Sequence, residues 1–197
     1  MNARKGGNVS PIPADHSQNL TGIWPKKVVN YKTVMSDAAS GFTSVTYPFP
    51  VIRMADLYLM YAEALNEKGE DYATVLPWID MVRERSGLQG VKESWDQYVG
   101  NSKYATQTGL RQIIMQERRI ELAFEGHYFW DVRRWKTATT ELTQPLTGWK
   151  VRYGETDVDY YSENLVLVRD FTPKMYFWPI DIGELRKDPN LVQNYGW

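Results

Sequence analysis

Residues 116–135 read QERRIELAFEGHYFWDVRRW and decide the fold, because they combine four arginines, four acidic residues and five aromatic residues. A solvent-exposed helix rarely carries so many aromatic side chains, and a hydrophobic core rarely admits so many charges. Both are accommodated where a helix packs on other helices through aromatic contacts and paired charges. We therefore expect a helix, a sharp turn and a second short helix, fastened to neighbouring helices.

The first of these two helices is indicated by apolar residues at helical spacing. These residues fall on one stripe of the predicted helix: Leu110, Ile113, Ile114, Ile120 and Phe124. Thr108 is suited to cap the N-terminus of such a helix, and Gly126 is suited to stop it after Glu125. The pattern predicts a helix over 108–125.

Three carboxylates interrupt this apolar stripe at intervals of one helical turn. Glu117 and Glu121 lie inside the stripe, and Glu125 lies at its edge. Buried ionised carboxylates need cations as partners, and the planar guanidinium group of arginine binds a carboxylate through two hydrogen bonds. We expect Glu117 and Glu121 to be largely buried, with at least one bonded to an arginine of another helix. The candidate partners in these structural ion pairs are Arg53, Arg83, Arg85, Arg133 and Arg134.

Two further helices are predicted before this stretch, over 53–68 and 72–86. Each carries a stripe of apolar residues, and Gly69 is suited to end the first. Pro77 should kink the second helix or delay its first turns. Two helices with a tight turn between them form an αα-hairpin, and the small alanines of the first make it similar to a tetratricopeptide helix. Such a hairpin cannot close its own core, so other helices must flank it.

The composition excludes several classes of protein. The 197 residues carry a formal net charge of −1, which argues against nucleic acid as a partner. The absence of cysteine excludes disulfides, thiol catalysis and cysteine–metal sites. No apolar run approaches the ~20 residues that span a bilayer.

The chain is predicted to be one mainly α-helical domain over 1–197. Residues 1–50 are rich in Gly, Pro, Ser and Thr and should be irregular, with one strand-like run over 27–34. Residues 53–135 form the helical core. Residues 136–197 return to loops with short apolar runs, followed by a C-terminal tail.

Aromatic residues outside any periodic pattern are candidates for ligand contact. Aromatic residues make up 14% of the chain, and those expected in loops are Trp95, Tyr98, Tyr104, Trp149, Tyr153, Tyr160 and Tyr161. Flat rings in loops can stack on the face of a sugar, although they also serve ordinary packing. We select Trp95, Tyr98, Tyr104 and Trp149 as candidate ligand-binding residues.

Four segments in the same order resemble one known family. They are residues 52–67 (IRMADLYLMYAEALNE), 82–88 (VRERSGL), 117–128 (ERRIELAFEGHY, followed by Asp131 and Arg133–Trp135), and the tail with YFWPI at 176–180 and PNLVQN at 189–194. Together they resemble the SusD/RagB family. The departures are mild: Asp188-Pro189 and Tyr195-Gly196 stand where that family often has Asn-Pro and Pro-Gly, and Pro77 is unusual.

The resemblance implies a fold and a function. Members are largely α-helical, with tetratricopeptide-like helix pairs arranged as a superhelix, long ligand-holding loops and a few short strands. They are non-catalytic lipoproteins on the bacterial outer surface that bind glycans or other nutrients. They act with a SusC-like, TonB-dependent outer-membrane transporter. Members are usually more than twice this length, so we expect a C-terminal portion, with the lipid anchor on a segment absent from this chain.

Two other functions compete with nutrient binding. The helix pairs would suit a scaffold that binds only protein. Glu117 and Glu121, one turn apart, fit roughly the ~5–5.5 Å separation of a retaining glycosidase pair, although such pairs usually come from different elements.

No cofactor and no metal site is expected. His16 and His127 are too few and too far apart for zinc, and the aspartates that might hold calcium (Asp15, Asp157 and Asp159) lack an EF-hand-like spacing.

Overall fold

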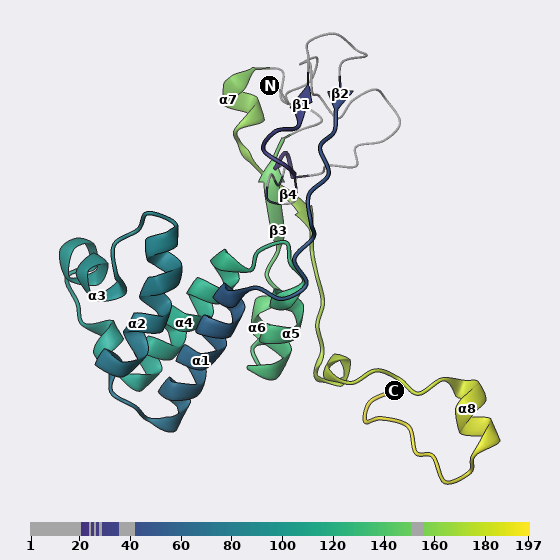
Figure 1. Cartoon of the computed structure of the whole chain (residues 1–197). Helices are drawn as coiled ribbons and strands as arrows, with labels where there is room; N and C mark the ends of the chain where they lie inside the picture. Colours follow the sequence, from purple (N-terminus) through teal and green to yellow (C-terminus); the bar gives the residue numbers. More distant parts are fainter. Residues whose placement is uncertain (1–20, 24, 26, 28, 36–41, 151–155) are drawn as a thin grey trace. The chain divides into compact units, whose positions relative to one another are not determined.

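The computed structural model describes residues 21–23, 25, 27, 29–35, 42–150 and 156–197. The chain is mainly α-helical, as the sequence predicts (Figure 1). It divides into two compact units. One, the helical unit, is Lys27–Trp130; the other, the second unit, combines Met1–Lys26 with Asp131–Trp197.

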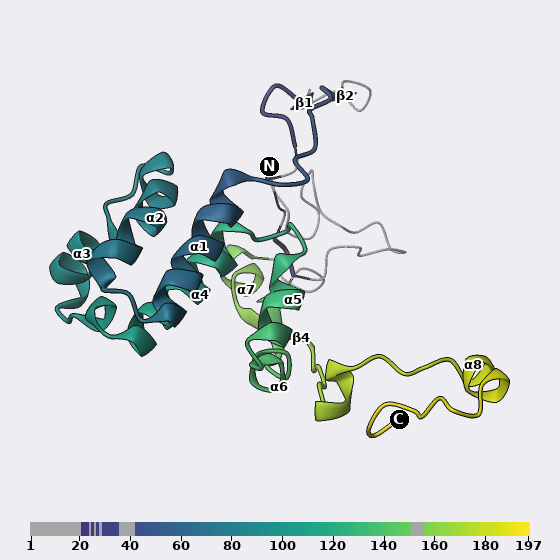
Figure 2. The same cartoon turned by 60° about the horizontal axis from the view of Figure 1, so that its bottom comes forward.

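The helical unit is built on three long helices, α1 (Met54–Lys68), α2 (Tyr72–Arg85) and α4 (Gln107–Glu121), which lie side by side in Figures 1 and 2. Gly69 ends α1 with a φ of 88°, as predicted. The Asp71 carboxylate caps α2 by accepting the Ala73 N–H at 2.8 Å. α2 continues through Pro77, and α1 and α2 form the predicted αα-hairpin.

Both predicted ends of α4 are wrong. The N-cap is Thr106, whose hydroxyl accepts the Gly109 N–H at 3.1 Å, and the helix ends at Glu121 instead of Glu125. In a continued helix the Glu121 carbonyl would accept from the N–H of residue 125. It accepts instead from the Arg53 side chain at 3.1 Å, and the chain turns away with a φ of 64° at Phe124. α5 (His127–Arg134) follows that turn.

The core of the helical unit lies between α1, α2 and α4. The most deeply buried side chains, each under 2% exposed, include Leu59, Val75, Ile79, Leu110 and Ile114. The predicted apolar stripe is therefore buried in its first half. Its last members, Ile120 and Phe124, are 61% and 66% exposed, because the helix ends beside them.

Residues 91–105 form short helices where the sequence predicted loops. α3 (Val91–Ser94) leads directly into a π-helical turn, η1 (Trp95–Val99), and the 3-10 turn η2 (Lys103–Ala105) follows. Val91 is fully buried in the core and fixes the start of this segment. Trp95, Tyr98 and Tyr104 are therefore held on helical turns.

Short antiparallel strand pairs complete both units. In the helical unit, β1 (Val34–Met35) pairs with β2 (Phe42–Thr43), with Val34 opposite Thr43. Of the described residues in the predicted strand over 27–34, Val34 alone is in a strand. The residues before it include a turn, in which the Thr33 N–H bonds to the Asn30 carbonyl at 2.9 Å.

The second unit contains β3 (Leu146–Trp149) and β4 (Glu163–Leu167), which pair with a register shift between Leu146 and Thr147. Its remaining helical elements are α6 (Ala138–Glu141), α7 (Asp157–Tyr160), η3 (Pro173–Tyr176) and α8 (Ile182–Lys187). None of the described helices is long and apolar enough to cross a bilayer.

The C-terminal tail is closed by side chains. The Gln193 amide donates to the Ile180 carbonyl at 2.9 Å and accepts the Ile180 N–H at 2.8 Å. Asn194 donates to the Trp178 carbonyl at 2.6 Å, and the Trp197 indole donates to the Lys174 carbonyl at 3.1 Å. Hydrogen bonds thus hold together the two ends of the predicted loop-like tail, on either side of α8.

Candidate functional site

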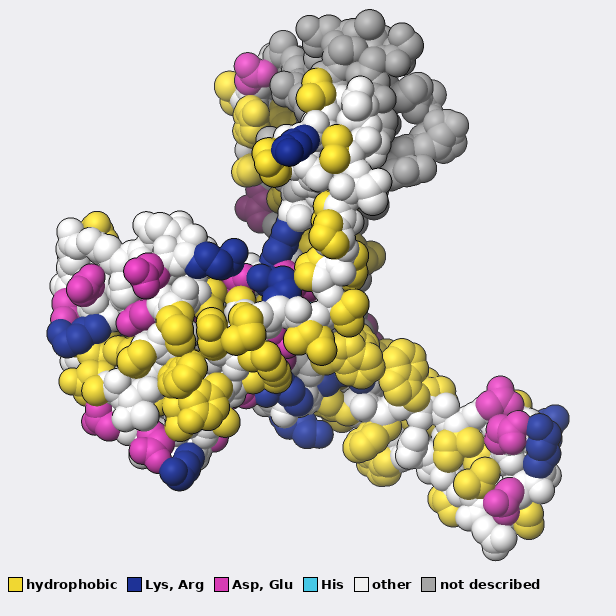
Figure 3. Space-filling view, viewed as in Figure 1, with side chains coloured by type: hydrophobic (Ala, Val, Ile, Leu, Met, Phe, Trp, Pro, Cys, Tyr) yellow, Lys and Arg dark blue, Asp and Glu magenta, His cyan; other side chains and the backbone are white. Residues whose placement is uncertain are grey.

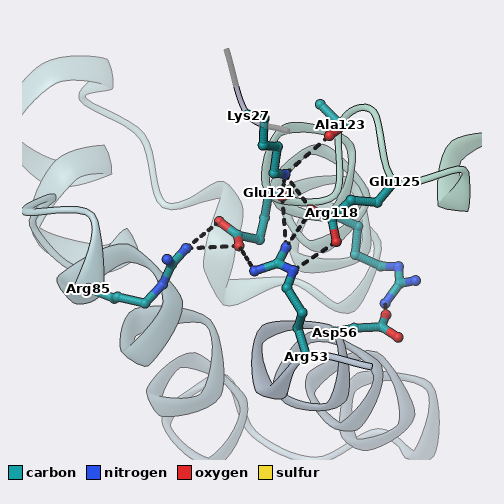
Figure 4. A network of polar contacts seen from close by, with 8 residues as sticks. All are labelled: Lys27, Arg53, Asp56, Arg85, Arg118, Glu121, Ala123 and Glu125. Carbon is teal, nitrogen blue, oxygen red and sulfur yellow. Dashed lines mark hydrogen bonds and ion pairs between the residues drawn. The ribbon is translucent and has the colours of Figure 1, made fainter. Parts of the chain in front are cut away.

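One arginine joins the two acidic residues at the end of α4, in the network of Figure 4. Arg53, next to the start of α1, donates from Nη1 to Glu121 Oε1 at 2.7 Å. Its Nε and Nη2 donate to the two carboxylate oxygens of Glu125 at 2.7 and 2.8 Å. The three side chains are only 12–20% exposed. The ion pairing predicted for Arg53, Glu121 and Glu125 is therefore present in the structure.

Two more cations complete this network from the outside. Arg85 of α2 donates to both oxygens of Glu121 at 2.8 and 2.9 Å. Lys27 Nζ lies 2.5 Å from Glu125 Oε1 and 3.1 Å from the Ala123 carbonyl, and it also bonds to the Glu121 carbonyl. A cation at the C-terminus of a helix is favoured by the helix dipole. The network thus fastens Lys27, α1 and α2 to the end of α4.

The electrostatics of this network favour the charged forms. Burial raises the pKa of Glu125, but the hydrogen bonds from Arg53 and Lys27 outweigh burial and leave that pKa below its ordinary value. The hydrogen bond to Glu125 raises the pKa of Arg53 in turn. Arg53 and Glu125 thus stabilise each other's charged form, and charge-assisted hydrogen bonds of this kind hold elements together.

A second pair of buried charges lies deeper on α4. Arg118 is 3% exposed and donates from Nη1 to Asp56 of α1 at 2.9 Å. The pairing of Arg118 with Asp56 was not predicted from the sequence. A signal was present, because Leu110, Ile114 and Arg118 are spaced four residues apart and so share the buried face of one helix. Lys27 gave no comparable signal, since nothing in its surroundings is periodic.

Glu117 is bound by an arginine of α2. Arg83 Nη1 bonds to Glu117 Oε1, and the two side chains are 15% and 14% exposed. Glu117 and Glu121 are thus largely buried and each is bonded to another helix, as expected. A glycosidase pair needs one carboxyl group to donate a proton to the leaving group. Both carboxylates here accept from guanidinium groups, which does not suit that role.

Arg133 and Arg134 lie in the second unit. Arg133 donates to the Met175 carbonyl at 2.6 Å, and its guanidinium carbon lies 5.1 Å from the ring centroid of Phe171. Arg134 donates to Asp131, a buried carboxylate, at 2.8 Å. The Arg134 guanidinium carbon also lies 4.7 Å from the ring centroid of Trp135. These contacts differ from the pairing with Glu117, Glu121 or Glu125 for which Arg133 and Arg134 were candidates.

Trp95 and Tyr98 form the aromatic part of the α3–η1 segment. Tyr98 is 72% exposed. Trp95 is half-buried against the core, and Lys103 Nζ lies 5.5 Å from its ring centroid. An aromatic ring beside an ammonium group can contact a sugar face while the cation binds hydroxyl or carboxylate oxygens. These two candidates therefore lie within four residues of each other on one turn.

Tyr104, one of the candidate ligand-binding residues, packs in the core of the helical unit. Its side chain is 5% exposed, and its ring packs edge-on against Tyr72 with centroids 5.4 Å apart. Its hydroxyl donates to Asp96 at 2.8 Å, and that bond raises the pKa of Tyr104. A ring enclosed in this way has no face open to a sugar. The residue instead supports the Trp95 segment from beneath.

Trp149 lies in the second unit, on β3. It is 36% exposed and packs edge-on against Tyr161, with ring centroids 5.7 Å apart. Tyr160 is buried, whereas Tyr161 is 62% exposed. Trp149 and Tyr161 thus form a second aromatic pair; Tyr153 lies outside the described residues.

Metal ligation finds no support in the described part of the chain, where no three acidic, His or Cys side chains lie close enough to hold an ion. Asp159 is occupied at the start of α7, where its carboxylate accepts from the Thr156 hydroxyl at 2.8 Å. Asp15 and His16 lie outside the described residues.

Comparisons with known proteins agree on one family. A model of the SusD family matches residues 6–197. Two SusD-like proteins of Formosa agariphila are 37% and 39% identical to this chain over 133 and 144 residues. These matches cover 67% and 73% of this chain but 26% and 23% of those proteins.

Solved structures give the same result. A SusD-like protein from Bacteroides fragilis matches with a TM-score of 0.69 and 28% identity, over 94% of this chain and 33% of its own. A protein from the same species, described as a SusD-like carbohydrate-binding protein, matches with a TM-score of 0.56 and 32% identity, over 73% and 28%. The chain therefore spans about a quarter of the length of the curated relatives and a third or less of these solved ones.

Proposed function

The chain belongs to the SusD family, and on that premise we propose that it is part of a surface-exposed protein that binds glycans for uptake across the bacterial outer membrane. The family match over residues 6–197 carries this proposal. The carbohydrate-binding role ascribed to one solved relative supports it. The working partner is a SusC-like, TonB-dependent transporter, and the protein is held at the cell surface by a lipid anchor.

The sugar contacts proposed within this chain are Trp95 and Tyr98 in the helical unit and Trp149 in the second unit. All three are at least partly exposed, and each is fixed on a helical turn or a strand. Rings fixed in advance lose less conformational freedom when they bind. The role proposed is binding without turnover, which agrees with the arginine bonds of Glu117 and Glu121.

The test is affinity gel electrophoresis of the purified chain in gels cast with soluble starch, arabinoxylan, galactomannan, pectin or alginate. We expect retardation by at least one of these polysaccharides and a smaller retardation of Trp95→Ala and Tyr98→Ala. Tyr31→Ala serves as the matched control, because Tyr31 is 89% exposed and is none of the three proposed contacts. Retardation equal for all variants, or release of reducing sugar, would contradict the proposal.

A protein-binding scaffold is the second candidate, and the surface of α1 favours it. Leu57, Met60 and Tyr61 are 42%, 43% and 48% exposed, and Figure 3 shows hydrophobic side chains gathered over α1. Exposed apolar patches commonly mark interaction sites. Capture of the neighbouring transporter by wild type but not by Leu57→Glu, with no retardation in any polysaccharide gel, would favour the scaffold.

A further inference from the structure

One arginine of α2 holds the segment 89–99 against the helical core. Arg83 Nε donates to the Gln89 carbonyl at 2.8 Å, and its Nη2 donates to the Ser94 hydroxyl at 3.1 Å. Its remaining terminal nitrogen, Nη1, bonds to Glu117 of α4. Arg83 therefore uses each of its three nitrogens on a different partner. Two of those partners belong to the segment and the third supplies a negative charge.

The negative charge of Glu117 allows the Arg83 guanidinium group to be largely buried. The Arg83 and Glu117 side chains are 15% and 14% exposed, so the guanidinium group is largely removed from water. A buried cation without an anion is strongly unfavourable, whereas a paired and hydrogen-bonded one is tolerated. Glu117 thus stabilises the arginine, and the arginine in turn fixes the main chain at 89 and the side chain at 94.

Two further hydrogen bonds fix the segment, one before and one after the residue Ser94 that Arg83 binds. Before Ser94, the Asp80 carboxylate of α2 accepts the Val91 N–H at 2.7 Å. After it, the Asp96 carboxylate accepts from the buried Tyr104 hydroxyl at 2.8 Å. The π-helical turn Trp95–Val99 begins directly after Ser94 and contains Asp96. π-Helical turns are rare and frequent at functional sites, which suggests that this conformation serves a purpose beyond packing.

We propose that Arg83, balanced by Glu117, is a positioning residue for glycan binding, because it fixes the turn that presents Trp95 and Tyr98 to a sugar. The inference rests on the proposed function of these two rings. It assigns Glu117 a role through Arg83 and not through proton transfer. It also gives a reason for an arginine bridge at this point: the rings are ordered before the ligand arrives, so less conformational freedom is lost on binding.

The sharpest test removes one hydroxyl. Ser94→Ala deletes the Arg83–Ser94 bond, together with the longer bond from the Ser94 hydroxyl to the Gln89 carbonyl at 3.4 Å, without leaving a buried charge. Ser94→Thr restores a hydroxyl at the same place. We expect Ser94→Ala to lower the affinity for the panel polysaccharide that retards the wild type by about threefold to tenfold. Ser94→Thr should bind like wild type. Ser86→Ala is the matched control, because its hydroxyl donates to the Val82 carbonyl of the helix that it ends and contacts no part of the 89–99 segment that the hydrogen bonds describe.

A second readout follows the ring itself and needs no ligand. The indole ¹H–¹⁵N signal of Trp95, assigned with Trp95→Phe, should shift and broaden in Ser94→Ala and in Glu117→Gln. It should stay unchanged in Ser86→Ala and in Glu84→Gln, which removes an exposed carboxylate beside Arg83 in the sequence. The melting temperature of Ser94→Ala should remain that of wild type, which separates positioning from a general loss of stability.

The outcomes divide clearly. An unchanged Trp95 signal and unchanged affinity in Ser94→Ala would overturn the positioning role, even if the wild type binds glycan. If Glu117→Gln does not fold, the two Ser94 variants still decide the matter. If the wild type binds none of the polysaccharides, the proposed function of this chain fails and the glycan part of the inference falls with it. The indole signal then reports separately whether Arg83 fixes the ring.

Discussion

At the scale of single residues, the charges on α4 act as fasteners. Glu121 receives hydrogen bonds from Arg53 of the α1 start and from Arg85 of α2, so one carboxylate joins three elements. Glu125 is joined by Arg53 and Lys27 in the same way. The arginines answer the question of why an apolar stripe is interrupted by acids: each acid is an attachment point for a neighbouring element.

Removing one of these acids should therefore destabilise the fold. Glu121→Gln leaves Arg53 and Arg85 without a shared anion, and we expect a loss of about 2–4 kcal/mol in the free energy of unfolding. A urea melt followed by circular dichroism measures it. Glu84→Gln, an exposed change on α2, should melt like wild type. Equal midpoints for Glu121→Gln and wild type would show that the network contributes nothing.

The same network predicts how stability depends on pH. Because the folded-state pKa of Glu125 lies below its ordinary value of 4.5, the unfolded chain binds this proton more readily than the folded one. The stabilisation is present above about pH 4.5 and is lost as the pH falls through the lower folded pKa. Glu125→Gln should flatten this acid limb in unfolding curves measured from pH 6 to 3. An unchanged slope would contradict the prediction.

At the scale of elements, caps set the ends of helices more firmly than periodicity does. Gly69 was identified as the end of α1 from the sequence, and its φ of 88° shows why glycine is needed there. The C-terminal end of α4 was predicted wrongly because its termination depends on Arg53 and Lys27, which are distant in the sequence. Local patterns cannot reveal a carbonyl that is claimed by a remote side chain.

The contribution of the glycine cap can be measured at the turn between α1 and α2. Gly69→Ala places a β-carbon on a left-handed residue and should cost about 1–2 kcal/mol of stability. The space around residue 69 is open, so the cost would come from the backbone alone. Asparagine tolerates this conformation better, so Gly69→Asn should lose less stability than Gly69→Ala when both are compared in a thermal melt. Equal losses for both substitutions would point to another cause.

Part of the candidate site could also be predicted from the sequence, and part could not. The pairing of Glu117 and Glu121 with arginines of the preceding helices was predictable, because buried carboxylates require cations and arginine binds them through two hydrogen bonds. The burial of Tyr104 was not, because an aromatic residue in an aperiodic stretch suits a core or a surface equally well. Only the packing of η2 against α4 separates Tyr104 from Tyr98.

At the scale of the whole molecule, the chain contains two compact units, and the helical unit encloses its own core. We expect the fragment Lys27–Trp130, expressed alone, to retain a single cooperative urea transition, because the buried residues of that core and the network of Figure 4 lie within it. Far-UV circular dichroism and a dispersed amide NMR spectrum would check this. A gradual transition without a baseline would show that the core depends on the second unit.

The enclosed network of Arg53, Glu121 and Glu125 also bears on ionic strength. Dissolved ions screen exposed charges over a few ångströms to about 10 Å, but they reach partly buried pairs much less. Surface pairs such as Lys187–Glu184, with side chains 72% and 56% exposed, should fade in concentrated salt, while the pairs at 12–20% exposure persist. The helical unit should therefore keep these attachments from dilute buffer to concentrated salt.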